Sequence, residues 1–153
     1  MIVLTPEQAA AIREHAERTY PEECCGVLIG RAGDEPLRVE LVREIANVHE
    51  DERRRRFLLD PRQHLAAQKE ARSRGLAVIG VYHSHPDHPA QPSEHDRLHA
   101  WPNLRYLIVS VERGRAGEIT AWTLADDGSA MLPEPLTVEP RRDQSAVVGG
   151  AAD

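Results

Sequence analysis

Residues 81–96 read VYHSHPDHPAQPSEHD, and this stretch decides which fold and which chemistry we expect of the chain. His83 and His85 end an apolar run typical of a buried strand, and on a strand two residues spaced in this way point to the same side. Ser93 is a good N-cap for a short helix, which would carry Asp96 about one turn from its start. Two imidazoles and one carboxylate suit tetrahedral zinc with a fourth position left to water. The spacing therefore predicts a metal hydrolase.

A zinc hydrolase also needs a carboxylate that takes a proton from water and returns it to the product. Glu22 and Glu23 precede an apolar strand expected at residues 25–30. Either could serve if that strand lies beside the histidine strand, and otherwise they are an exposed acidic pair. Three nearby histidines fit a ligand spacing less well than His83 and His85 do, and we expect them to be solvated or packing residues: His88, His95 and His99.

Length and composition favour one globular domain. The chain has 153 residues, 41% of them hydrophobic, and a formal net charge of −6, which argues against a nucleic-acid binder. No apolar run is long enough to span a membrane, and the first residues do not resemble a signal peptide. Cys24 and Cys25 are adjacent and are the only cysteines, so a disulfide framework is excluded. We therefore expect a cytoplasmic protein that binds neither membrane nor nucleic acid.

Strands and helices are expected to interleave, which predicts an α/β fold with a mixed central β-sheet flanked by helices. The predicted strands are 2–4, 25–30, 37–45, 76–85, 104–111 and 119–124, and the predicted helices are 6–20, 60–74 and 94–101. Proline and charged residues follow the last of these strands. We therefore predict a domain at residues 1–132 and a flexible C-terminal tail at 133–153.

The same residues resemble the JAMM family of zinc metallopeptidases, also called MPN-type or Mov34/PAD-1. The family motif places a glutamate upstream of His-x-His-Pro and then Ser-x-x-Asp, which stand here as HSHP at 83–86 and SEHD at 93–96. The upstream Pro-x-Glu-x-Cys-Gly of the family is found as PEECCG at 21–26. This alignment selects Glu23 over Glu22, and the resemblance covers roughly residues 1–125.

The resemblance implies a role for each matching residue. His83, His85 and Asp96 would bind Zn²⁺, and Glu23 would act first as general base and then as general acid. Ser93 would cap its helix and also donate a hydrogen bond to the tetrahedral oxyanion. The implied architecture is the α/β fold that this family shares with cytidine deaminases, but the Pro-Cys-x-x-Cys piece of a zinc deaminase is absent from this sequence.

The substrate class also follows from the resemblance. Family members cut amide or isopeptide bonds after the C-terminal Gly-Gly of ubiquitin-like proteins. This chain is short and is similar to compact prokaryotic members such as the CysO-cysteine peptidase group. Its expected substrate and partner is therefore a sulfur-carrier protein of the ThiS, MoaD or CysO type, from which it would release cysteine or trim residues.

Two alternatives remain open beside this reading. One is a deubiquitinase-like isopeptidase that acts on ubiquitin-like conjugates. The other is a non-catalytic MPN scaffold, although such members usually lack the metal ligands. The sequence does not determine the oligomeric state. The VVGG at 147–150 resembles the end of a sulfur carrier, and a disordered tail of coincident composition is the simpler explanation.

Overall fold

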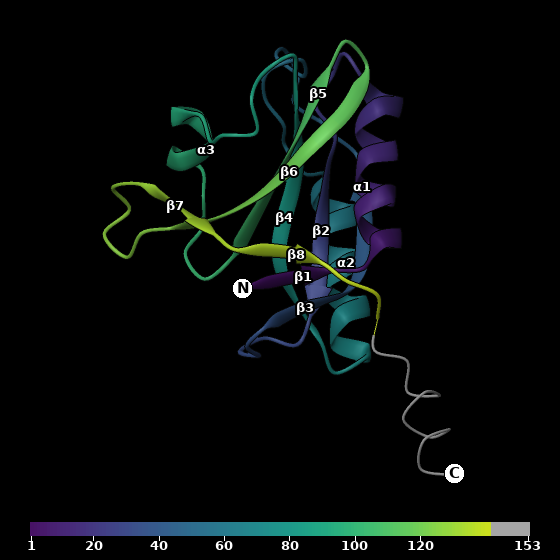
Figure 1. The fold of residues 1–153 in the computed structure, drawn as a ribbon, viewed down its shortest axis with the longest axis vertical. Helices are drawn as coiled ribbons and strands as arrows, with labels where there is room; N and C mark the ends of the chain where they lie inside the picture. The colour runs from purple at the N-terminus through teal and green to yellow at the C-terminus, as the bar shows by residue number, and fades with distance from the viewer. Residues whose placement is uncertain (142–153) are drawn as a thin grey trace.

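An eight-stranded mixed sheet forms the centre of the protein (Figure 1), and the computed structural model describes residues 1–141. The sheet order is β7-β6-β5-β4-β2-β3-β1-β8. The strands are β1 (Ile2–Leu4), β2 (Cys25–Gly30), β3 (Leu37–Ile45), β4 (Ala77–Pro86), β5 (Arg105–Glu112), β6 (Arg115–Leu124), β7 (Met131–Glu134) and β8 (Leu136–Val138). The helices are α1 (Pro6–Thr19), α2 (Pro61–Ser73) and α3 (Glu94–Leu98).

The sheet is mixed, as predicted, and has a helix on each face. β1 pairs in parallel with β3 and β8, and β4 with β5, while the other pairs are antiparallel. α1 packs mainly over β3, β5 and β6, and α2 over β2, β3 and β4. Successive residues of β2 separate onto these faces, since Leu28 lies in the core beneath α1 and Val27 in the core beneath α2. The alternation of apolar side chains along β2 therefore builds two cores.

Both long helices begin where the sequence predicts, because their first turns are capped. The Thr5 hydroxyl accepts a hydrogen bond from the Gln8 backbone N–H, and the Gln8 side chain accepts one from the Thr5 backbone N–H. The Asp60 carboxylate likewise accepts from the first backbone N–H groups of α2. Pro6 and Pro61 then fit the first helical position, where no N–H is needed.

The connection from β4 to β5 brings a helix to the functional end of the sheet. These strands are parallel neighbours, so the chain has to cross from the end of β4 back to the start of β5. Residues 87–104 make this crossover and contain α3, which stands on the side of the sheet away from α1 (Figure 1). α3 ends at Leu98, earlier than the predicted residue 101, because His99 already has non-helical backbone at the C-cap.

The C-terminal part of the described chain differs from expectation. The expected domain end at residue 132 falls inside β7, and β8 pairs in parallel with β1. Ile2 donates a backbone hydrogen bond to Pro135, and Glu139 donates one to Leu4. β8 has a threonine at its centre and lacks the continuous apolar run of β1, so its pairing reveals it and its composition does not. The predictions for residues 142–153, including VVGG, lie outside the described residues. No helix within 1–141 is long and apolar enough to cross a membrane.

Candidate metal centre

The two histidines of the predicted site lie at the end of β4, near the middle of the sheet. Both side chains point to the same side, and only 1% of His83 and 8% of His85 is exposed. Their Nε2 atoms are 3.1 Å apart. The strand is hydrogen-bonded on both sides, to β2 and to β5. The backbone that carries the two histidines is therefore held rigidly, as a preorganised site requires.

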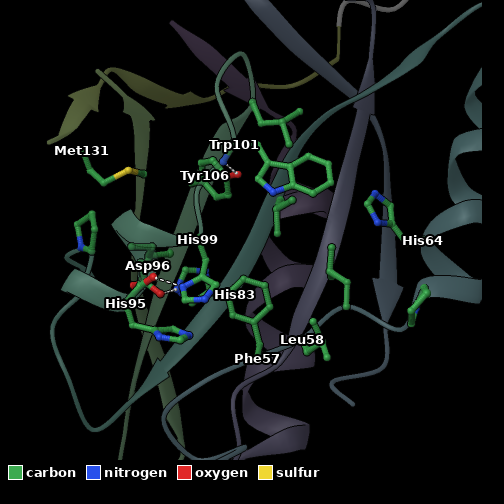
Figure 2. A pocket seen from close by; sticks show the side chains of 16 residues that line it. Phe57, Leu58, His64, His83, His95, Asp96, His99, Trp101, Tyr106 and Met131 are labelled. Carbon is green, nitrogen blue, oxygen red and sulfur yellow. Dashed lines mark hydrogen bonds and ion pairs between the residues drawn. The ribbon is translucent and has the colours of Figure 1, made fainter. Parts of the chain in front are cut away.

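Asp96 reaches the histidine pair from α3 (Figure 2). Its Oδ1 lies 3.3 Å from His83 Nε2, and its Oδ2 lies 3.1 Å from His85 Nε2. Ser93 caps α3 as predicted: its hydroxyl accepts from the Asp96 N–H at 3.0 Å, while its own N–H donates to Asp96 Oδ2 at 2.9 Å. One potential ligand atom from each of His83, His85 and Asp96 falls within 4.8 Å of the others. The crossover connection thus brings Asp96 to the two histidines at the end of β4, and the three side chains form one cluster.

The protonation of the cluster fits a divalent metal ion. His85 Nδ1 lies 2.9 Å from the Pro89 carbonyl, which can only accept, so Nδ1 donates to Pro89 and Nε2 is the ring nitrogen that faces the cluster. Burial lowers the pKa of His83 and outweighs the Asp96 carboxylate, which raises it, so burial favours the neutral form of this imidazole. Neutral imidazole nitrogens and an ionised carboxylate are the usual ligands of such ions.

The Asp96 carboxyl group is ionised despite being mostly buried. Burial alone would raise the pKa of Asp96, but hydrogen bonds with His83 and His85 outweigh burial and hold this pKa well below its usual range. The ionised carboxylate places a negative charge in a buried site. A bound cation would offset that charge, because unpaired buried charge is costly.

Glu23 lies beside this cluster, as the strand pairing requires. β2 runs antiparallel to β4 with Cys25 opposite His83, and the next pair, Cys24 and Ser84, exchanges two hydrogen bonds. Glu23 consequently comes level with His85, on the same face of the sheet. The condition that β2 adjoins the histidine strand is confirmed.

The carboxyl group of Glu23 is buried without a hydrogen-bond partner among residues 1–141. Only 4% of Glu23 is exposed, and its Oε1 has no partner. Burial, together with the charge of Asp96, raises the pKa of Glu23 to about 9. Glu22, in contrast, is partly exposed and pairs with Arg53 at 3.3 Å. The structure thus separates the two glutamates that the residues alone left open.

A cavity of about 290 Å³ opens next to the cluster (Figure 2). His83 and Asp96 line it, and most of its other walls are apolar: Phe57, Leu58, Leu59, Pro61, Val81, Pro92, Trp101, Leu104, Tyr106, Ile108 and Met131. Trp101 lines this cavity although 61% of it is exposed, so it lies at the rim. His95 and His99 also line it, with their rings tilted at 32° to each other, but neither joins the cluster of potential ligands.

The motif-based prediction missed two residues of the surroundings. The ring of Phe57 stacks on that of His83, with centroids 4.5 Å apart. The side chain of Asn47 donates to the backbone carbonyl of Glu23 at 3.0 Å. One signal was available for Phe57, because it is the only phenylalanine in the chain and follows a run of four arginines. Nothing local in the sequence links Asn47 to Glu23.

Comparison with known proteins gives a consistent family assignment. Residues 5–125 match the prokaryotic homologs of the JAB domain. A desampylase from Haloferax volcanii is 39% identical over 115 residues, 72% of this chain and 77% of the relative. A CysO-cysteine peptidase from Mycobacterium tuberculosis is 28% identical over 140 residues, 90% and 91% of the two chains. A probable TtuB-protein conjugate cleaving protease from Thermus thermophilus is 36% identical, covering 68% and 66%.

Solved structures agree on the fold. A solution structure of a protein from Desulfitobacterium hafniense superimposes with a TM-score of 0.80 at 33% identity, covering 94% of this chain and 97% of that one. A JAB1/MPN domain protein from Archaeoglobus fulgidus has a TM-score of 0.56 at 18% identity, covering 91% and 99%. At that identity the second match is evidence for the fold alone.

Proposed function

This chain belongs to the family of prokaryotic homologs of the JAB domain, and we propose that it is a zinc-dependent peptidase acting on a ubiquitin-like sulfur-carrier protein. The bond cleaved is the amide bond after the carrier's C-terminal Gly-Gly. One observation carries the proposal: the unpartnered carboxyl group of Glu23 lies beside three converging potential ligands, His83, His85 and Asp96. A metal hydrolase needs at least a metal site and an adjacent group that transfers protons.

His83, His85 and Asp96 would hold the Zn²⁺ in this proposal. When bound, zinc supplies a Lewis acid that lowers the pKa of water and polarises a carbonyl group. The donor set supports zinc, since two imidazoles and one carboxylate leave the fourth tetrahedral position free. The hydrogen bond from His85 Nδ1 to Pro89 fixes the tautomer that ligation needs.

Glu23 moves the proton. In hydrolysis, water adds across the amide bond, its oxygen joins the carbonyl carbon, and one of its protons passes to the leaving amine. Glu23 takes that proton and then delivers it to the amine nitrogen as the carbon–nitrogen bond breaks. Burial, which raises the pKa of Glu23 to about 9, suits a carboxylate that has to hold a proton between these steps. A cation at the neighbouring cluster would lower this pKa and so restore the basic form.

Ser93 serves as a hydrogen-bond donor as well as a cap. Its hydroxyl oxygen accepts from the Asp96 N–H, which leaves the hydroxyl proton free to donate. Ser93 is exposed at the start of α3, beside the carboxylate of Asp96. There the hydroxyl can stabilise the negative oxygen that develops on the substrate carbonyl.

A relative that spans most of this chain favours a sulfur carrier as substrate. The CysO-cysteine peptidase aligns with 90% of the chain, and its name specifies a CysO-cysteine substrate. The second candidate is an isopeptidase on protein conjugates, favoured by the relative named as a TtuB-protein conjugate cleaving protease. Both candidates cut beyond an extended carrier terminus, and two glycines allow such a terminus to thread a narrow cleft.

The test compares wild type, Glu23→Gln and Glu22→Gln on two substrates, a carrier–cysteine adduct and a carrier–lysine isopeptide. We expect wild type to bind one zinc ion and release cysteine, and Glu23→Gln to keep zinc while losing at least about 100-fold in rate. Glu22→Gln should cleave like wild type. Cleavage of the isopeptide alone would transfer the assignment to the second candidate. Zinc binding absent from wild type would leave the non-catalytic scaffold.

A further inference from the structure

The ring of His83 lacks a hydrogen bond at Nδ1 like the one that orients the ring of His85. His85 donates its Nδ1 proton to the Pro89 carbonyl, but His83 Nδ1 is buried without a hydrogen-bond partner among the described residues. Metal-binding histidines usually donate this second nitrogen to a carboxylate, carbonyl or water, which fixes the plane of the ring. Something else must hold the ring of His83 in the plane that directs its Nε2 at Asp96.

Phe57 is in contact with that ring. The two ring centroids are 4.5 Å apart and the ring planes meet at 25°, which is a stacked arrangement. Phe57 is half-buried and projects over His83 from the segment between β3 and α2, as the close-up of the cavity shows (Figure 2). Stacking at this distance restricts rotation of the His83 ring, which no hydrogen bond at Nδ1 restrains.

Asn47 holds Phe57 in place from both sides. Its Nδ2 donates to the Arg56 carbonyl at 3.0 Å, and its Oδ1 accepts from the Leu58 N–H at 3.1 Å. These are the two residues that flank Phe57 in the chain. The same amide donates from Nδ2 to the Glu23 carbonyl at 3.0 Å. A single side chain thus ties the segment that carries Phe57 to the strand start that carries Glu23.

We propose that Phe57 and Asn47 are positioning residues, with Phe57 replacing the absent Nδ1 partner of His83 and Asn47 fixing Phe57 relative to Glu23. This inference rests on the proposed function, because it assigns His83 to a metal ion. Neither residue touches the reacting atoms in this role. Their effect passes through the ring plane of His83 and hence through the strength and geometry of metal binding.

The test measures metal binding directly. Zn²⁺ affinity is determined by competition with a chromophoric chelator, and the visible spectrum of the Co²⁺ form reports ligand geometry. We expect Phe57→Leu, which keeps apolar volume but loses the ring, to weaken Zn²⁺ binding by about tenfold or more and to change the Co²⁺ spectrum. Phe57→Tyr keeps the ring and should retain both wild-type values. Val48→Ala, in the same segment and without a ring, is the matched control.

Equal Zn²⁺ affinity and equal Co²⁺ spectra for Phe57→Leu, Val48→Ala and wild type would overturn the role of Phe57. If Phe57→Leu shows no cooperative melting, Phe57→Met is judged by the same two measurements. Wild type that neither binds zinc nor cleaves either substrate would overturn both this inference and the proposed function. Wild type that does both, beside an unaffected Phe57→Leu, would overturn the positioning role alone.

Asn47→Asp tests the second residue. The substitution keeps the oxygen that accepts from Leu58 but removes the Nδ2 donor to Glu23 and Arg56. Because the effect is transmitted by Phe57, we expect the Zn²⁺ affinity to fall and the Co²⁺ spectrum to change in the same sense as in Phe57→Leu. A folded Asn47→Asp protein with both properties of wild type would show that Asn47 has no part in positioning.

Discussion

The Nε2 atoms of His83 and His85 lie 3.1 Å apart on one face of a buried strand. At this distance one imidazole can donate an N–H to the other, or both nitrogens can bind one cation. Asp96 adds a carboxylate to both nitrogens. The three side chains are therefore compatible with a metal site.

Removing one ligand should abolish metal binding. Asp96→Asn keeps the shape of the side chain but loses the charge, and we expect bound zinc, measured by elemental analysis after dialysis, to fall from one ion per chain to a small fraction. His88→Ala is the control, because His88 is an exposed histidine of the same segment outside the cluster. Equal zinc contents in the two variants would contradict the ligand assignment.

The metal-free protein should lose stability as the pH rises. Burial, with the charge of Asp96, raises the pKa of Glu23 from 4.5 to about 9, so folding favours the protonated carboxyl group. The stability this provides is fully present below pH 4.5 and is lost as the pH rises towards 9. Glu23→Gln removes the ionisation and should raise the free energy of unfolding at pH 8 by roughly 4–5 kcal/mol. Urea unfolding in excess chelator measures this.

The control for that measurement is Glu22→Gln, one residue away and paired with Arg53 at the surface. Its free energy of unfolding should have the pH dependence of wild type, because exposed ion pairs contribute little. If wild-type stability in chelator were flat between pH 5 and pH 9, the burial of an unpartnered Glu23 would be refuted.

Gly26 should tolerate no side chain. A Cβ there would meet the ring of Tyr82 and come within 2.5 Å of the Arg43 carbonyl oxygen. Gly26→Ala would push β2 away from β3 and displace the Tyr82 ring, and we expect a loss of roughly 2–3 kcal/mol in the free energy of unfolding. Gly117→Ala is the matched control, because its nearest neighbour, Ser110 Oγ, is 3.4 Å away. Thermal melting of both variants tests the difference.

The opposite face of β4 should affect stability and not metal binding. The Tyr82 hydroxyl is 2.7 Å from His15 Nδ1, and both groups are buried under α1. Tyr82→Phe leaves His15 without this partner and should cost about 1–3 kcal/mol of unfolding free energy. Zinc affinity should stay at the wild-type value, since Tyr82 points away from the cluster.

Tyr20→Phe is the control for Tyr82→Phe, because its hydroxyl bonds to Asp87 at the surface. We expect it to cost less than about 1 kcal/mol. A drop in zinc affinity in Tyr82→Phe comparable with that in Asp96→Asn would mean that the two faces of β4 are coupled.

Much of the fold could be predicted locally. The caps at Thr5 and Asp60 and the prolines after them set both long helices, because first-turn hydrogen bonds involve only near neighbours. The apolar runs gave the inner strands. β7 and β8 were not predicted, because MLPE and LTV lack the continuous apolar run that marks β1, and because both strands are held by partners far along the chain.

The sequence by itself predicted the potential ligands and their spacing. His83 and His85 share a face because strand side chains alternate, and Ser93 starts the helix that carries Asp96 because its hydroxyl caps an N–H three residues on. Only the tertiary structure decided which glutamate is buried beside them and which residues hold them. Those facts depend on the register of β2 against β4 and on Asn47 reaching Glu23, contacts between segments that no local pattern encodes. Such contacts form, and contribute to stability, only when distant segments of the chain come together in the fold.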